Sequence, residues 1–187
     1  GAASDDLTLP APTYPEVARL LDAGDHTAAL DQLNDTVQTG PDQPLEALVL
    51  RATLLDAAGR GADGEAVWRQ VIDREVWMRT FSRRALVVSL AARGEPALAS
   101  PILAELNRSD PTRHLDLTLL IADAHRERQD FDAAASLYRD ALRRQRRGAL
   151  ADRARLGLAY VEEGAGDLSA AIATLRTAQL EHRTGPG

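Results

Sequence analysis

The sequence has no cysteine and no lysine, and it has few aromatic residues and no long apolar run. Without cysteine, the 187-residue chain has no disulfide, no thiolate nucleophile and no cysteine-ligated zinc site. All 22 basic residues are arginines, against 28 acidic residues, and the formal net charge is −6. Binding to nucleic acid or to an anionic membrane surface requires clustered positive charge, so neither is expected. No apolar stretch reaches the roughly 18 residues of a membrane-spanning helix, so no membrane insertion is expected.

Recognisable catalytic patterns are missing as well. The four histidines (His26, His114, His125 and His182) have no metal-ligand spacing. No glycine-rich phosphate loop, G-x-S-x-G element or Ser-His-Asp arrangement is present. We therefore expect no catalytic residue, metal site or cofactor in this segment, and predict that it is not an enzyme; a catalytic domain elsewhere in a longer product remains open. His125 stands where other repeats carry Leu or Tyr, which predicts a packed core histidine.

A repeat of 35 residues runs through the chain. A small residue followed four positions later by a bulky one recurs at Ala29/Leu33, Gly64/Trp68, Ala99/Leu103, Ala134/Tyr138 and, 37 residues on, Ala171/Leu175. A second series with the same period contains Val17, Ala52, Val87, Ala122 and Gly157. Helix breakers recur at Gly24, Gly59, Gly94 and Gly164, with Gln129 in the fourth copy. Self-similarity at such a period indicates a repeat architecture.

The repeat predicts paired helices. Ala, Leu, Arg and Glu dominate the composition, and these residues favour helices. Within each pair, the small residue lets a neighbouring helix approach closely, and the bulky residue one turn later fills the groove beside it. One hairpin cannot bury its apolar faces alone, so consecutive hairpins are expected to stack.

At these positions the chain resembles the tetratricopeptide repeat family. The matching features are Gly157 with Tyr160, Ala134 with Tyr138, the turns Gly24-Asp25 and Gly166-Asp167, and the closing residues Pro41 and Pro111. The resemblance covers residues 15–180 and implies an all-α fold, a right-handed superhelical solenoid of five helix-turn-helix hairpins with about ten helices. It also implies a bacterial protein-binding scaffold or adaptor.

The repeat phase predicts the organisation of the chain. We expect a flexible lead-in over residues 1–14, a solenoid over 15–181 and a flexible tail over 182–187. The repeat units are predicted at about 10–44, 45–79, 80–114, 115–149 and 150–181. The chain begins without Met, and Gly1-Ala2-Ala3-Ser4-Asp5-Asp6 fits either the mature end left by a signal peptidase or a cloning remnant. The compartment stays open, with the periplasm or cell envelope slightly favoured.

The resemblance implies a partner-binding groove, because first helices line the inner wall of such folds. The repeat phase assigns to this wall Thr53, Asp56, Arg84, Val88, Asp123, Arg126, Glu127, Leu158 and Glu162. The aromatic-rich segment 77–84 borders it. We expect one of Trp77 and Phe81 to fill the junction between units and the other to be an exposed anchor for a partner.

The leading functional hypothesis is a non-catalytic scaffold whose groove binds a peptide or helix of another protein. One alternative is a helical accessory domain of a larger enzyme, as in lytic transglycosylases. Another is a self-assembling scaffold, in which copies of the chain form a homo-oligomer.

Overall fold

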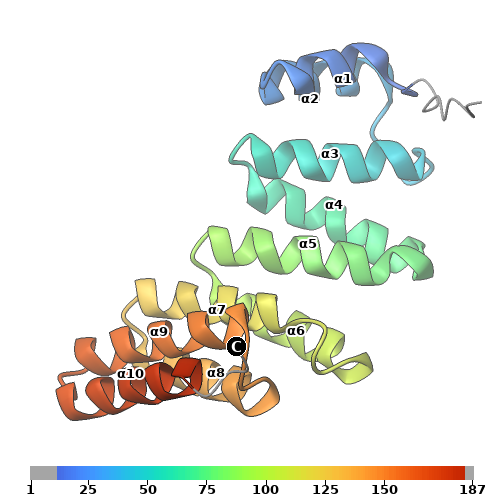
Figure 1. Ribbon diagram of the computed structural model, residues 1–187. Helices are drawn as coiled ribbons and strands as arrows, with labels where there is room; N and C mark the ends of the chain where they lie inside the picture. The colour runs from blue at the N-terminus through green and yellow to red at the C-terminus, as the bar shows by residue number, and fades with distance from the viewer. Residues whose placement is uncertain (1–11, 184–187) are drawn as a thin grey trace, which may run out of the picture. The chain divides into compact units, whose positions relative to one another are not determined.

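Helices account for most of residues 12–183, which the computed structural model describes (Figure 1). The α-helices are α1 (Pro15–Asp22), α2 (His26–Thr36), α3 (Leu45–Ala57), α4 (Gly61–Arg74), α5 (Arg79–Ala92), α6 (Pro96–Ser109), α7 (Leu115–Glu127), α8 (Phe131–Arg144), α9 (Ala149–Gly164) and α10 (Leu168–Arg183). One 3₁₀ helix, η1 (Val76–Met78), precedes α5. No strand occurs within this range. The prediction of an all-α fold with five helical hairpins is confirmed.

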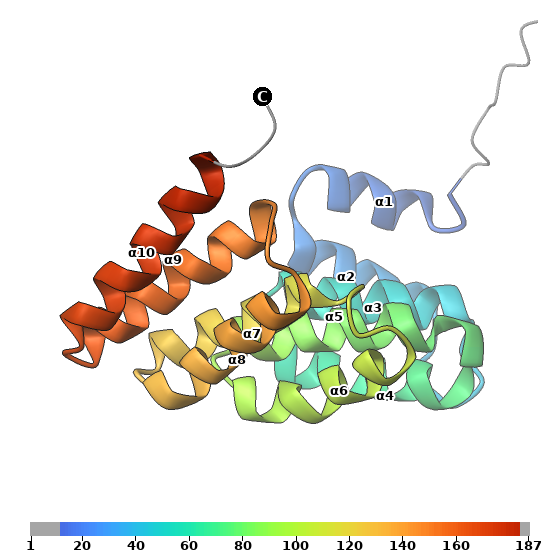
Figure 2. The same ribbon diagram turned by 60° about the horizontal axis from the view of Figure 1, so that its bottom comes forward.

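The chain forms two compact units, Gly1–Val71 and Ile72–Gly187, with the boundary in the last turn of α4. The core of the first unit contains Val17 of α1, Leu33 of α2 and Leu54 of α3. One core cluster of the second unit is formed by side chains of α7, α8 and α9. Figure 2 shows α10 lying along α9 at the end of this second unit.

The turn between the two helices of a hairpin needs a left-handed residue. In the fourth hairpin this residue is Gln129, whose φ of 61° is the only positive φ of a non-glycine residue in the described range. In the fifth hairpin it is Gly166, with a φ of 83°, so the predicted breaker Gly164 is wrong. Gly164 is the last residue of α9, and a Cβ there would lie 2.9 Å from Cζ of Phe131. The two extra residues of this repeat thus lengthen α9 and shift the turn.

The predicted ends of the chain fall largely outside the described residues, which exclude 1–11 and 184–187. The tail was expected to begin at residue 182, but α10 continues through His182 and Arg183. The imidazole Nε2 of His182 lies 3.2 Å from Oδ2 of Asp152 on α9, and this contact accompanies the two additional helical residues.

Gly157 of α9 and Tyr138 of α8 make a very close contact between hairpins in the second unit. A Cβ at Gly157 would lie 2.4 Å from Cε1 and Cζ of the Tyr138 ring, inside van der Waals contact. Tyr138 is fully buried, and its hydroxyl donates a hydrogen bond to Asp123 of α7. The ring therefore has no freedom to move aside, and only glycine fits at position 157.

We expect Gly157→Ala to lower the free energy of unfolding by about 1–3 kcal/mol, the usual cost of overpacking a core. Alanine favours a helix over glycine by roughly 1 kcal/mol, so a loss would show that the Tyr138 contact dominates. Urea unfolding followed by circular dichroism measures the change. The matched background is Tyr138→Leu, because the third hairpin carries Leu103 at the same position with Ala122 in place of Gly157. In that background Gly157→Ala should be neutral or stabilising; an equal loss in both backgrounds would contradict the packing argument.

Candidate partner-binding groove

A groove on the second unit is lined by first helices of three consecutive hairpins. It has a volume of about 380 Å³. Its walls are formed by Phe81, Arg84, Ala85 and Val88 of α5, by Asp116, Leu117 and Leu120 of α7, and by Arg153 of α9. Phe81 and Val88 are the most open apolar side chains, with exposed fractions of 54% and 47%. The groove thus combines exposed apolar surface with charged groups at its edge.

Arg84 organises one edge of the groove. Its guanidinium donates hydrogen bonds to both carboxylate oxygens of Asp116, and its Nη1 lies 2.9 Å from Nδ1 of His114. Burial opposes ionisation of Asp116, but the hydrogen bonds from Arg84 outweigh it and hold the pKa of this carboxyl below its usual value. Burial and the positive charge of Arg84 lower the pKa of His114. The imidazole is therefore held neutral, with Nδ1 accepting from Arg84.

A second cluster joins α7, α8 and α9 around Asp123. The carboxylate accepts hydrogen bonds from the Tyr138 hydroxyl and from Nη2 of Arg153, and Nη2 of Arg126 lies 3.9 Å away. Burial, together with the hydrogen bond to Asp123, raises the pKa of Tyr138, so the hydroxyl stays a proton donor. Arg153 both lines the groove and contacts Asp123, so this cluster fixes the groove wall that α9 contributes.

The predicted wall residues of the first unit, Thr53 and Asp56, lie on α3. Thr53 is exposed, and its hydroxyl donates to the carbonyl of Val49 at 2.8 Å. Asp56 accepts a hydrogen bond of 2.8 Å from Nε1 of the buried Trp68. This hydrogen bond therefore links α3 to α4 within the second hairpin.

The predicted wall residues of the second unit divide between the groove and the core. Phe81, Arg84 and Val88 line the groove. Leu158 was expected on the wall but is 6% exposed and packs in the core, because it is apolar where α7 carries Asp123. Glu162 is buried too, and accepts a hydrogen bond of 2.7 Å from the Thr174 hydroxyl of α10. Both are corrections to the predicted site.

The remaining predicted residues lie outside the groove lining. The Arg126 guanidinium lies 5.6 Å from the centre of the Tyr160 ring, a cation–π arrangement. Glu127 is exposed at the end of α7. Trp77, on η1, is 72% exposed, so Trp77 and Phe81 are both open, and the expectation that one of them fills a junction is wrong.

Sequence reasoning missed Asp116, Leu117, Leu120 and Arg153 as groove residues. The period contained a signal for two of them: Asp116 follows Phe81 by 35 residues, and Leu120 follows Ala85 by 35. Arg153 enters the groove through its contact with Asp123, and no periodic signal indicates that contact.

Residues 12–183 also bear on metal binding and on membrane insertion. No group of three or more His, Asp or Glu side chains in this range is arranged to hold a metal ion. None of the described helices is long and apolar enough to cross a membrane. His125, predicted as a core histidine, is buried and its Nδ1 lies 2.9 Å from Oδ2 of Asp130.

Comparisons with known proteins agree with this architecture. A family model described as tetratricopeptide repeat matches residues 119–187. The fold is similar to solved structures of MamA. MamA of MSR-1 is 16% identical, with a TM-score of 0.63 over 91% of this chain and 95% of that chain. MamA from Desulfovibrio magneticus RS-1, from residue 41 to its end, is 15% identical, with a TM-score of 0.64 over 91% and 94%. MamA of AMB-1 is 14% identical, with a TM-score of 0.62 over 91% and 98%.

Residues 119–187 thus match the tetratricopeptide repeat family, and the chain has the all-α fold of a tetratricopeptide repeat solenoid. No curated protein matches its sequence. At identities this low, the likeness to MamA shows the fold alone. A tetratricopeptide repeat fold is in general a non-catalytic scaffold for protein interaction, and its partners are proteins.

The buried His114 predicts a pH dependence of the stability of the chain. Its pKa lies below the ordinary value of 6.5 in the folded chain, so the unfolded chain binds the proton first as the pH falls. The contribution of the neutral His114 to the free energy of unfolding should therefore be fully present above about pH 7. It should decrease as the pH falls through about 6.5. Urea midpoints between about pH 7.5 and about pH 5 measure it. His114→Gln, which keeps an acceptor for Arg84 but does not titrate, should flatten this slope; an unchanged slope would exclude His114 as its source.

Proposed function

We propose that this tetratricopeptide repeat protein is a non-catalytic interaction module that binds a peptide or helix of a partner protein in the groove between α5, α7 and α9. The observation that carries the proposal is the half-exposure of Phe81 and Val88 inside a hollow that also has charged side chains, Arg84, Asp116 and Arg153, in its lining. Each Å² of apolar surface that a partner removes from water contributes about 25 cal/mol of favourable free energy. Aromatic side chains in the centre of such a surface commonly carry much of the binding energy.

The charged residues at the edge of the groove favour a partner segment that has both apolar side chains and a carboxylate. Arg84 and Asp116 neutralise each other within the wall, so a partner does not have to supply a counter-charge for either. Arg153 is paired with Asp123, yet its side chain is 44% exposed and has further guanidinium donors. We therefore expect the partner segment to place apolar side chains against Phe81 and Val88 and a carboxylate near Arg153.

The volume of about 380 Å³ sets the size of the bound segment. This is near the lower end of ligand sites in proteins, which hold one small molecule or a few side chains. A short apolar stretch of a peptide, or one face of a helix, fits this space.

A displayed random-peptide library, selected on the full chain, tests the proposal. Enriched peptides are synthesised with a fluorophore and their affinity is measured by fluorescence anisotropy. Val88→Asp should weaken binding by about tenfold or more, since a buried, unpaired charge would then face the peptide. The matched control is Leu98→Asp on α6, which changes a residue of similar exposure, 54%, outside the groove lining.

The proposal is tested by the difference in peptide affinity between Val88→Asp and Leu98→Asp. Selected peptides should carry apolar residues next to Asp or Glu, and Leu98→Asp should bind them like the wild type. Equal affinity of Val88→Asp and the wild type for every enriched peptide would overturn the proposal. Both substitutions are at exposed positions, and an unchanged helical circular dichroism spectrum verifies that each variant is folded.

A further inference from the structure

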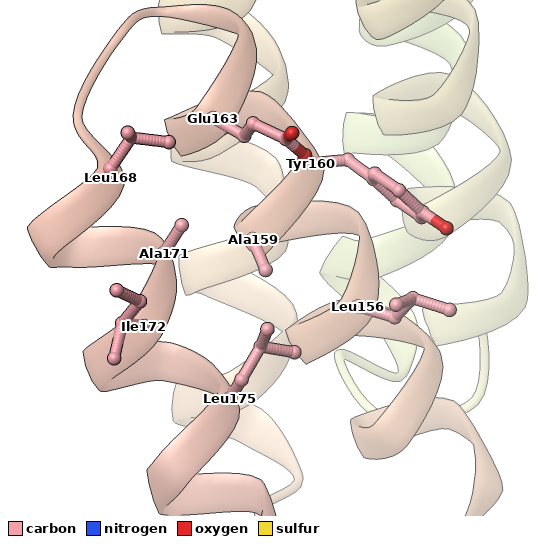
Figure 3. A pocket seen from close by; sticks show the side chains of 8 residues that line it. All are labelled: Leu156, Ala159, Tyr160, Glu163, Leu168, Ala171, Ile172 and Leu175. Atoms are coloured by element: carbon pink, nitrogen blue, oxygen red, sulfur yellow. The ribbon is translucent and has the colours of Figure 1, made fainter.

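A second apolar groove lies between α9 and α10, and it shares no residue with the groove on α5, α7 and α9. It has a volume of about 350 Å³. Figure 3 shows residues that line it, with Leu156 and Tyr160 on α9 and Leu168, Ile172 and Leu175 on α10. Each of these five side chains is about half exposed or more. Such an apolar concentration on a described surface indicates an interaction site.

The repeat itself shows that these positions are normally covered. Leu156 corresponds to Ile121, one period of 35 residues earlier, and Leu175 corresponds to Tyr138 by the 37-residue step of the second helices. Ile121 and Tyr138 are both fully buried, whereas Leu156 is 50% and Leu175 48% exposed. One hairpin further back, Leu86 and Leu103 at the same positions are buried as well. Within the described residues, the α9–α10 hairpin therefore exposes a face that the two preceding hairpins bury.

The element that covers the preceding hairpin is a single amphipathic helix, α9. It packs against α7 and α8 through small or medium apolar side chains, among them Ala154, Leu158 and Val161. Gly157 allows α9 to pass over the Tyr138 ring. In the last hairpin Leu175 replaces that ring, so a helix with alanine at the corresponding point would also fit. The groove on α9 and α10 thus has the form of a site for one helix.

Charge complementarity specifies this helix further. Glu162 of α9 lies 3.6 Å from Nη2 of Arg139 on α8. Arg176 of α10 stands at the position of Arg139, 37 residues later, and it is exposed. A covering helix of the same kind would therefore place a carboxylate opposite Arg176. Ion pairs of this kind across an interface contribute mainly to specificity and register.

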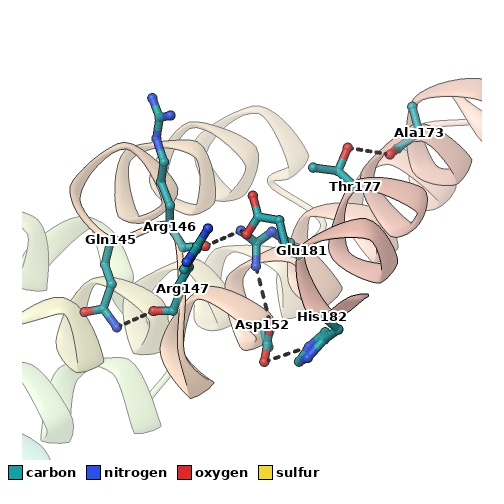
Figure 4. Close-up of polar contacts among 9 residues, drawn as sticks. Gln145, Arg146, Arg147, Asp152, Ala173, Thr177, Glu181 and His182 are labelled. Carbon is teal, nitrogen blue, oxygen red and sulfur yellow. Dashed lines mark hydrogen bonds and ion pairs between the residues drawn. The ribbon is translucent and has the colours of Figure 1, made fainter. Parts of the chain in front are cut away.

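The two walls of the groove are held in place. Arg155 of α9 donates hydrogen bonds to Glu181 of α10 and to the carbonyl of Arg146, and it lies 3.3 Å from Asp152 (Figure 4). His182 of α10 pairs with the same Asp152. The Arg155 side chain is 6% exposed, so these bonds are shielded from water. The groove is therefore pre-formed, which lowers the cost of binding.

A second copy stacked head to tail is a poor occupant. Its first unit would have to offer an apolar counterpart, but the large apolar side chains exposed in the described range all lie from Val76 onward. Neither α1 nor α2 contributes one.

We propose that the groove between α9 and α10 is a docking site for one amphipathic helix of a partner protein, with small apolar residues on its buried face and a carboxylate opposite Arg176. This site is distinct from the groove of the proposed function and does not depend on it.

The probe is a synthetic peptide with the sequence of residues 149–164, acetylated and amidated at its ends. It is titrated into the full ¹⁵N-labelled chain and followed by amide chemical shifts. We expect shift changes around Ile172 and Leu175 that saturate with peptide concentration. Ile172→Glu should abolish them, while Leu98→Glu, an exposed position on α6, should leave them unchanged.

A charge exchange tests the register. A peptide with Glu162→Arg should bind the wild-type chain about tenfold more weakly than the parent peptide. The Arg176→Glu variant of the chain should recover its affinity.

Three results would overturn the proposal. The first is the absence of shift changes around Ile172 and Leu175. The second is a set of changes centred on Tyr138, which would mean that the peptide replaces α9 itself. The third is a self-association of the chain, seen by sedimentation equilibrium and removed by Ile172→Glu, which would make a second copy the occupant. None of them affects peptide binding at Val88, so the two proposals fail separately.

Discussion

The close contact between consecutive hairpins is the constraint on which the rest of the second unit depends. Tyr138 fills the space beside α9, and the lack of a side chain at Gly157 leaves room for the ring. Small differences of this kind set how near two helices approach, because interiors of proteins are close-packed and do not absorb an extra methyl group. The Tyr138 hydroxyl then orients Asp123, and Asp123 binds Arg153. A packing contact in the core thus positions a charged side chain of the groove.

The chain has no lysine, and arginine side chains donate many of the hydrogen bonds that connect its helices. Within the first unit, Arg51 donates to the carbonyl of Val37 at the end of α2 and to two side chains. Arg79 donates to the carbonyl of Ile72 near the end of α4, and Arg155 to that of Arg146 beyond α8. The last carbonyls of a helix have no partner within the helix, and a planar guanidinium can bind a carbonyl and a carboxylate together. These side chains therefore fix where one hairpin ends and the next begins.

The fold could be predicted from the sequence because the 35-residue period repeats the same packing five times, and each copy confirms the others. The site could be predicted only in part. Phase gives only the side of a helix: Val88 lines the candidate groove, whereas Leu158, which belongs to the same series and was predicted on the same wall, packs in the core. An apolar side chain at such a boundary is drawn into the core, whereas Asp123 at the corresponding position stays at its edge. Phase also carries no information on contacts between hairpins, such as Arg153 with Asp123.

The departures from the repeat carry more information about binding than its regular part. A position that is buried in two hairpins and half exposed in a third keeps its apolar side chain only at a cost in solubility, unless another surface covers it. Leu156 and Leu175 are such positions. Phe81 and Val88 are exposed on α5 beside an ion pair that is already satisfied, so their apolar area is the part of that groove left for a partner. The same comparison of corresponding positions can be made in any repeat protein, because each unit is an internal reference for the burial of the next.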